Sequence, residues 1–106
     1  MIGLLGISHK TASLEIREKY ALSNEEILCF ADCLQQDTNI THCAILSTCN
    51  RTEIYFYCES DSYNSIFDKA YKVLNSYKGV NEHNWHHFYH LSNLDVVGHL
   101  FQVASG

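Results

Sequence analysis

The sequence predicts an α+β fold in which an antiparallel sheet is covered by helices. Three features predict it: short apolar runs typical of strands, segments with the apolar spacing of helices, and polar turns between them. A length of 106 residues is usual for one domain. With 46% hydrophobic and 18% charged residues, the chain has the composition of a globular protein with a buried core. We therefore expect one folded domain over residues 1–106.

The first elements are expected to be a strand and two helices. Residues 2–8 form an apolar run whose glycines allow neighbouring backbone or substrate to approach closely, and a polar turn follows over residues 9–13. Residues 14–21 favour a short helix. Ser23 and Glu26 form a capping box that opens a second helix, which we expect to end near residue 36 because the next residues favour a turn.

A β-hairpin is expected in the middle of the chain. The apolar residues 43–46 lead to Cys49, and the chain reverses at Asn50 and Arg51. In the strand that follows, apolar and polar positions alternate, which is typical of a strand with one exposed face. The apolar positions are Ile54, Phe56 and Cys58, and the alternate positions are Glu53, Tyr55, Tyr57 and Glu59.

The last third is expected to add two more helices and a strand. A polar turn over residues 60–62 precedes an amphipathic helix that Gly79 ends, and a helical turn at 83–87 precedes a strand at 88–91. Ser92, with Asp95 three residues later, is expected to cap the last helix. One apolar stripe of that helix is Leu94, Val97, Phe101 and Ala104, and the adjacent stripe is Val96, His99 and Val103.

The predicted order is β-α-β-β-α-β followed by a helix. This is the split βαβ, or ferredoxin-like, arrangement, with an antiparallel sheet covered by helices and an additional C-terminal helix. The last helix stops at residues 104–106 without a recognisable terminating signal. We therefore expect that the chain was cut from a longer protein.

Charge and cysteine usage restrict the class of protein. A formal net charge of −5 argues against a protein that binds nucleic acid through a broad basic face, but it leaves room for a nucleic acid held by a few local basic residues. No apolar run approaches the roughly 20 residues that span a bilayer, and the N-terminus lacks the basic region of a signal peptide. Five irregularly spaced cysteines indicate reduced thiols. We expect a cytoplasmic protein with no membrane partner.

Cys49 is the main candidate for chemistry. A cysteine at a strand end is commonly a small buried apolar residue, but Cys49 has polar neighbours, including Thr48 and Asn50. Arg51 would favour the thiolate, and backbone N–H groups at the chain reversal would receive an oxyanion. The sequence therefore indicates a candidate nucleophile. The other cysteines, Cys29, Cys33, Cys43 and Cys58, are interpreted as structural.

Arg51 and two histidines are the other candidate site residues. The Arg51 guanidinium suits bidentate binding of a carboxylate, although a surface salt bridge with Glu53 or Glu59 explains it equally well. His99, on the apolar side of the last helix, is the candidate partner of the thiol. A hydrogen-bonded core histidine is the alternative role for His99, and His9 is the alternative partner.

No metal or dinucleotide site is expected within the chain. The histidine-rich segment 83–90 has pairs with one-turn helical spacing but no nearby residues that complete a four-ligand set. Gly3 and Gly6 lie within a strand and lack the strand–turn–helix context of a dinucleotide fingerprint. Any redox cofactor would have to be held by another part of the protein.

The signature of the glutamyl-tRNA reductase family resembles residues 47–55, with the sequence STCNRTEIY. The family's N-terminal strand and following turn resemble residues 6–12 and 16–19, and the helix near the end of its catalytic domain resembles residues 99–106. The blocks occur in the family's order and cover essentially the whole chain. Ser13 stands where the family usually has proline, which affects only the rigidity of the turn.

This resemblance implies a covalent mechanism. Cys49 would attack the ester carbonyl that joins glutamate to tRNA, releasing tRNA and leaving a thioester. Hydride from NADPH would reduce the thioester to glutamate-1-semialdehyde, in the first step of tetrapyrrole (porphyrin, haem) synthesis from glutamate. Thr48, Asn50 and Arg51 would hold the substrate, with Arg51 pairing its side-chain carboxylate. His99 would orient or polarise the reacting group.

The resemblance also implies that residues 1–106 are the N-terminal catalytic domain that binds glutamyl-tRNA. The NADPH-binding and dimerisation domains would lie outside this chain, so the fragment alone would not complete the reduction. The full-length enzyme would be a homodimer that hands its product to an aminomutase. A non-catalytic ferredoxin-like module that binds an anionic ligand through Arg51 and Lys10 is the alternative, and a small zinc-binding domain built on the histidine-rich segment is a third hypothesis.

Overall fold

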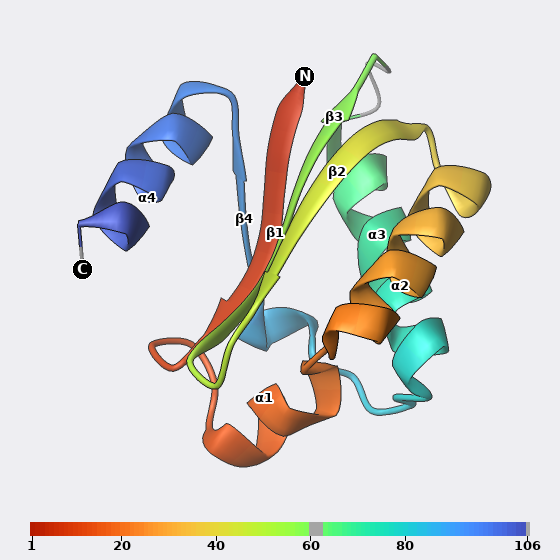
Figure 1. Ribbon diagram of the computed structural model, residues 1–106, viewed down its shortest axis with the longest axis vertical. Coiled ribbons are helices and arrows are strands. Elements are labelled where there is room, and N and C mark those ends of the chain that lie inside the picture. The colour runs from red at the N-terminus through yellow and green to blue at the C-terminus, as the bar shows by residue number, and fades with distance from the viewer. Residues whose placement is uncertain (60–62, 106) are drawn as a thin grey trace.

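The computed structural model describes residues 1–59 and 63–105. Its strands are β1 (Ile2–Ser8), β2 (Ile40–Ser47), β3 (Arg51–Cys58) and β4 (Tyr89–Ser92). Its helices are α1 (Leu14–Tyr20), α2 (Asn24–Asp37), α3 (Tyr63–Lys78) and α4 (Leu94–Ala104), with a short 3-10 helix at Trp85–His87 (Figure 1). The predicted polar turn over residues 60–62 lies outside the described residues.

The strands form one sheet in the order β2-β3-β1-β4, and each neighbouring pair is antiparallel. β1 and β3 are therefore the central strands, and the hairpin partner β2 and the late strand β4 are the edges. This topology is that of the split βαβ fold. The predicted ferredoxin-like α+β architecture with a C-terminal helix is confirmed.

The main core lies between one face of the sheet and helices α2 and α3, while α4 lies against the opposite face (Figure 1). The sheet contributes Leu5, Ile7, Ile54 and Phe56 to this core, and the helices contribute Phe30, Leu34, Phe67 and Leu74. Because side chains alternate along a strand, Leu4, Gly6 and Ser8 of β1 face the α4 side. No helix in the described parts of the chain is long and apolar enough to span a bilayer.

Helix ends explain which of the predicted boundaries are found. The capping box of Ser23 and Glu26 opens α2, and Gly79 ends α3 with a φ of 66°. The prediction that Ser92 caps α4 is wrong: the residue before this helix is Asn93, with a φ of 52° that asparagine tolerates. Its Oδ1 accepts a hydrogen bond from the backbone N–H of Ile2, and its own N–H donates to the Ile2 carbonyl. The Asn93 side chain therefore ties the start of α4 to β1 and makes no hydrogen bond to the helix.

Candidate active site

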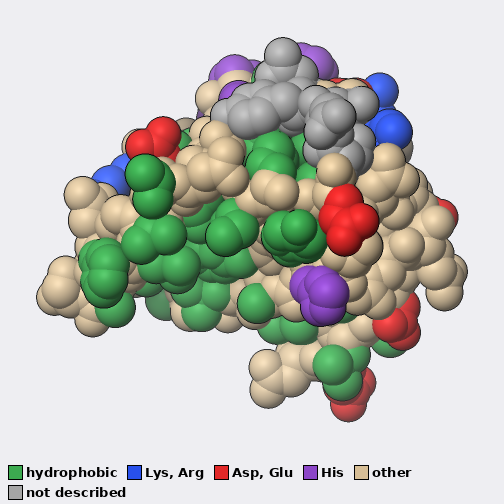
Figure 2. Space-filling view, turned by 90° about the horizontal axis from the view of Figure 1, so that it is seen from above, with side chains coloured by type: hydrophobic (Ala, Val, Ile, Leu, Met, Phe, Trp, Pro, Cys, Tyr) green, Lys and Arg blue, Asp and Glu red, His purple; other side chains and the backbone are tan. Residues whose placement is uncertain are grey.

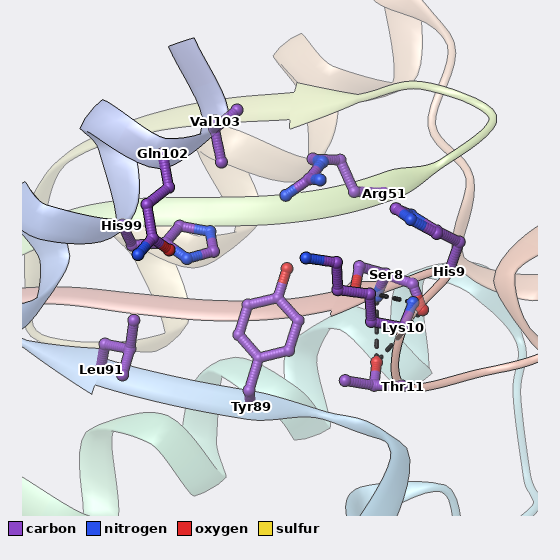
Figure 3. A pocket seen from close by; sticks show the side chains of 10 residues that line it. All are labelled: Ser8, His9, Lys10, Thr11, Arg51, Tyr89, Leu91, His99, Gln102 and Val103. Atoms are coloured by element: carbon purple, nitrogen blue, oxygen red, sulfur yellow. Dashed lines mark hydrogen bonds between the residues drawn. The ribbon is translucent and has the colours of Figure 1, made fainter. Parts of the chain in front are cut away.

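A cavity of about 430 Å³ opens between α4 and the C-terminal end of β1. Its lining comes from β1 and the loop after it (Ser8, His9, Lys10, Thr11), from β3 (Arg51), from β4 (Tyr89, Leu91) and from α4 (His99, Gln102, Val103) (Figure 3). Segments that are far apart in the sequence thus direct polar side chains into one hollow. The cationic or protonatable groups of this lining are His9, Lys10, Arg51 and His99.

A buried carboxylate, Glu53, organises the wall of this cavity. Its side chain has no solvent exposure. The hydroxyl of Tyr55 donates to Oε1 at 2.7 Å, and the hydroxyl of Tyr89 donates to Oε2 at 2.5 Å. Nε2 of His99 also lies 2.5 Å from Oε2, and Nη1 of Arg51 lies 3.6 Å from it. A buried carboxylate is costly unless it is paired and hydrogen-bonded, and Glu53 has both kinds of partner.

The strand register brings Glu53 and Tyr89 together across a glycine. Gly6 of β1 is paired with Glu53 on one side and with Tyr89 on the other. A Cβ atom at Gly6 would lie 2.8 Å from the Tyr89 ring, so a larger residue would displace that ring. The absence of a side chain at Gly6 lets the Tyr89 ring lean across β1 and reach a carboxylate two strands away.

Glu53 is ionised at neutral pH. Burial raises its pKa, but the hydrogen bonds from Tyr89, Tyr55 and His99, together with the charge of His99 when its ring is protonated, outweigh burial, so the net pKa is lowered. The two tyrosines show the complementary effect. Burial, followed by the hydrogen bond to Glu53 and its charge, raises the pKa of both Tyr55 and Tyr89. Both phenols therefore stay protonated and act as donors to the carboxylate.

His99 takes its orientation from Glu53. An ionised carboxylate only accepts hydrogen bonds, so the Nε2 atom beside Glu53 must carry a proton. Nδ1 is then the nitrogen with a lone pair in the neutral ring, as in sites where a carboxylate fixes the tautomer of a histidine. His99 comes from α4 and also lines the cavity (Figure 3). The interpretation of His99 as a hydrogen-bonded histidine and its interpretation as a site residue are thus compatible.

The cavity favours an anion. Arg51 and Lys10 both point into it (Figure 3), and the carboxylate that partly balances Arg51 is already shared among four partners. The salt bridge of Arg51 with Glu53 anticipated from the sequence exists, but it is largely buried, with the two side chains 19% and 0% exposed. A guanidinium with limited exposure next to an ammonium group suits a carboxylate ligand.

Cys49 occupies the tight turn between β2 and β3. The Thr48 hydroxyl accepts hydrogen bonds from the backbone N–H groups of Asn50 and Arg51, and the Thr48 N–H donates to the Arg51 carbonyl at 2.8 Å. The Cys49 side chain is exposed at the tip of this turn. The N–H groups of residues 50 and 51, which were expected to receive an oxyanion, are therefore engaged by Thr48.

The turn is joined to the loop after β1. The Arg17 guanidinium of α1 donates to the carbonyls of Cys49 and Ala12, and the His9 N–H donates to the Asn50 carbonyl at 2.8 Å. Cys49 and Thr48 line a second hollow of about 390 Å³, between the turn and α1. Cys49 thus lines the hollow next to α1 and is not among the residues that line the cavity, and the Asn50–His9 hydrogen bond joins the turn to the loop that does.

The structure brings some of the predicted site residues together and leaves others apart. Arg51 and His99 share the cavity, Cys49 and Thr48 share the neighbouring hollow, and Asn50 joins the turn to the loop that carries His9. Between the two histidines, His9 is tied through its backbone to the residue after Cys49, whereas His99 is tied to Glu53.

The histidine-rich segment is occupied by ring contacts. Trp85 stacks on His90 with ring centroids 5.7 Å apart, and the rings of His86 and His87 lie 4.0 Å apart. Within residues 1–59 and 63–105, no group of three or more His, Cys, Asp or Glu side chains could hold a metal ion. The zinc hypothesis thus has no ligand set among these residues.

Sequence reasoning missed the role of Glu53. The alternating pattern placed it on the exposed side of β3, whereas Thr52, Glu53 and Ile54 are all buried. The alternation itself is correct, but α4 covers this part of the second face. The sequence did contain a signal. Glu53 lies in the block 47–55 and His99 in the block 99–106, and a carboxylate and a histidine that face the same side of a sheet commonly form a hydrogen bond.

The comparisons with known proteins decide the family. Residues 5–106 match the family model described as "Glutamyl-tRNAGlu reductase, N-terminal domain". The chain belongs to this family. It is 40% identical over 104 residues to a glutamyl-tRNA reductase of Brevibacillus brevis, covering 97% of this chain and 22% of that protein. It is 41% identical over 106 residues to one from Pseudoalteromonas translucida, covering 96% and 24%.

A solved structure agrees with these relatives. The glutamyl-tRNA reductase from Methanopyrus kandleri matches 99% of this chain and 22% of its own chain, with a TM-score of 0.67 and 25% sequence identity. The family resemblance seen in residues 6–12, 47–55 and 99–106 is therefore confirmed. The chain spans less than a quarter of the length of these relatives.

Proposed function

We propose that this chain is the catalytic domain of a glutamyl-tRNA reductase and that it captures the glutamyl group of glutamyl-tRNA as a thioester on Cys49. The observation that carries this proposal is a cationic cavity built around Arg51 and the Glu53–His99 pair, one turn away from an exposed thiol, in a member of this family. An anion-binding cavity beside a nucleophile suits an acyl substrate that carries its own carboxylate.

The charges of the cavity match those of a glutamyl group. Arg51 and Lys10 would bind the side-chain carboxylate, and Nδ1 of His99, held by ionised Glu53, would accept a hydrogen bond from the α-ammonium group. These contacts would leave the ester carbonyl directed toward the turn that carries Cys49. Thr48 accepts two backbone hydrogen bonds through its hydroxyl oxygen and still has its hydroxyl proton to donate to the substrate, with Asn50 beside it.

The covalent step exchanges one acyl bond for another. The Cys49 thiol loses its proton, its sulfur forms a bond with the ester carbonyl carbon, and the carbon–oxygen bond to the ribose breaks; the leaving ribose oxygen takes up one proton in place of the one that the thiol lost, so the tRNA leaves with a free hydroxyl. A thioester accepts hydride more readily than an oxygen ester does. Capture by Cys49 therefore prepares the acyl group for the reduction for which the relatives are named.

The two glycines of β1 do not form a dinucleotide-binding loop. Gly3 and Gly6 lie within β1 under the rings of Phe56 and Tyr89, where no phosphate could approach them. We therefore propose that NADPH binds to the part of the longer protein that this chain does not span. We further propose that the complete enzyme is a cytoplasmic homodimer and that it passes its product, glutamate-1-semialdehyde, to an aminomutase.

The proposal is tested by measuring tRNA release from glutamyl-tRNA by the full-length protein without NADPH. We expect one rapid turnover for the wild type, none for Cys49→Ser, and unchanged release for Cys29→Ser, a matched exposed cysteine on α2. Release that survives in Cys49→Ser would contradict the capture step. Absence of tRNA release by the wild type would favour the alternative of a non-catalytic module in which Arg51 and Lys10 only bind an anion.

A further inference from the structure

Helix α4 is strongly apolar except along one side, which carries Asp95, His99 and Gln102, yet much of its apolar surface is uncovered. Asp95 is the one acidic or basic residue among its eleven residues apart from His99. The apolar side of an amphipathic helix is normally buried against another part of the protein. In this structure Val96 is 1% exposed because it packs against the sheet, whereas Leu94 is 84% exposed and Phe101 is 73% exposed.

The sheet next to α4 is also uncovered on this side. Helix α4 packs on β4 and β1, and it leaves side chains of β2 and β3 open, with His42 and Ala44 exposed and Tyr57 41% exposed. An apolar groove of about 450 Å³ runs between the helix and these strands. Its lining includes Ile2, Tyr55 and Tyr57 from the sheet and Val96 and Leu100 from the helix.

Exposed apolar residues are concentrated on this side of the molecule. Of the eight large hydrophobic residues exposed among the described residues, six lie on α4 or at this groove: Ile2, Tyr57, Leu94, Val97, Leu100 and Phe101. We call these six residues the α4 apolar face, and Figure 2 shows hydrophobic side chains gathered there. A contiguous apolar patch of this kind marks an interaction site. Because the lining of the groove contains no Asp, Glu, Lys or Arg, its occupant must itself be largely apolar.

The width of the open strip matches one helix. Neighbouring strands lie about 4.8 Å apart, so a pair of strands is about 10 Å wide, which is the diameter of a helix with its side chains. On the other face, α2 and α3 together cover the four-stranded sheet. On this face α4 covers β4 and β1, and the two remaining strands leave room for one more helix.

We propose that a helix from the part of the same polypeptide that follows residue 106 packs beside α4 over β2 and β3 and covers the α4 apolar face. The family model names this region an N-terminal domain, and the chain spans only 22–24% of the relatives' length, so a longer protein of this family has ample chain to supply the helix. The helix would contact Tyr55, whose hydroxyl holds Glu53, and would therefore complete the wall of the candidate active site.

Hydroxyl-radical footprinting of the 106-residue chain and of the full-length protein tests this proposal. Phe101 is 73% exposed here, and a covered core residue is below about 10% exposed, so we expect about a sevenfold lower modification rate in the full-length protein. Tyr57 should be protected as well. Leu28, which is 71% exposed on α2 in the opposite layer, is the matched control and should keep its rate. Buried Phe30 should stay unmodified in both proteins, which shows that both are folded.

Two results would overturn the proposal. Equal modification of Phe101 and Tyr57 in both proteins would show that no segment of the longer chain covers this face. Protection that depends on protein concentration, in either protein, and that disappears on dilution to monomers would assign the face to a second copy of the chain. Protection that persists in full-length monomers supports the proposal.

Discussion

Glu53→Gln is the sharpest test of how the candidate active site is held together. The substitution keeps the size of the side chain but removes its charge and replaces one acceptor oxygen with an amide donor. Hydrogen bonds to charged groups contribute about 1.5–3 kcal/mol, against about 0.5–1.5 kcal/mol for neutral pairs, so each of the three bonds from Tyr55, Tyr89 and His99 loses about 1 kcal/mol. Part of this loss is offset because a neutral amide is less costly to bury.

We therefore expect the free energy of unfolding to fall by about 2 kcal/mol in Glu53→Gln, and Tm to fall by about 10 °C. Urea denaturation at pH 7 measures the first quantity and a thermal melt the second. Glu59→Gln, an exposed carboxylate just after the same strand, is the matched control and should change stability by less than about 0.5 kcal/mol. Equal stabilities of the two variants would refute the claim that Glu53 organises this wall.

The pH dependence of stability predicts the direction in which the effect of Glu53→Gln changes on acidification. The pKa of Glu53 is lowered from the ordinary value of 4.5 in the folded protein, so its ionised form contributes stability that is fully present above pH 4.5. That stability is lost as the pH falls through the lowered folded pKa. Because glutamine does not titrate, the stability difference between wild type and Glu53→Gln should stay constant above pH 4.5 and shrink as the pH falls below 4.5. A difference that grows on acidification would contradict the assignment.

Two further substitutions test the glycine contact and the anion anchor. Gly6→Ala should lower the free energy of unfolding by about 1–3 kcal/mol because its Cβ would lie 2.8 Å from the Tyr89 ring, whereas Gly98→Ala, with no atom within 4 Å, should be neutral or stabilising in the same urea titration. Arg51→Lys keeps the charge but loses the planar fork, so the KM for glutamyl-tRNA should rise about tenfold, and an unchanged KM would remove Arg51 from substrate binding.

Local signals predicted the fold well because they depend on neighbouring residues. The capping box of Ser23 and Glu26 and the terminating Gly79 are readable within a few positions, and both are found. Ser92 failed as a cap because Asn93 is bonded to Ile2, at the other end of the chain. That contact exists only after β1 and the start of α4 have been brought together.

The site could be predicted only in part for the same reason. Arg51 and His99 were identified from the sequence and share the cavity, but their link through Glu53 depends on the register of β1 with β3 and β4. The alternating pattern on β3 could not show that a helix from the end of the chain buries Glu53. The two apolar stripes on α4 did not show which of them would be buried. In the structure the stripe with Leu94 is exposed, and the stripe with Val96 packs on the sheet.

The most direct test of the central claim is to locate the acyl group itself. Full-length protein is mixed with glutamyl-tRNA in the absence of NADPH, quenched in acid, which preserves thioesters, and digested for peptide mass mapping. We predict one glutamyl group on the peptide that contains Cys49 and none on the peptides of the other four cysteines. A glutamyl group on another residue, or none on Cys49 while tRNA is still released, would contradict the proposed capture.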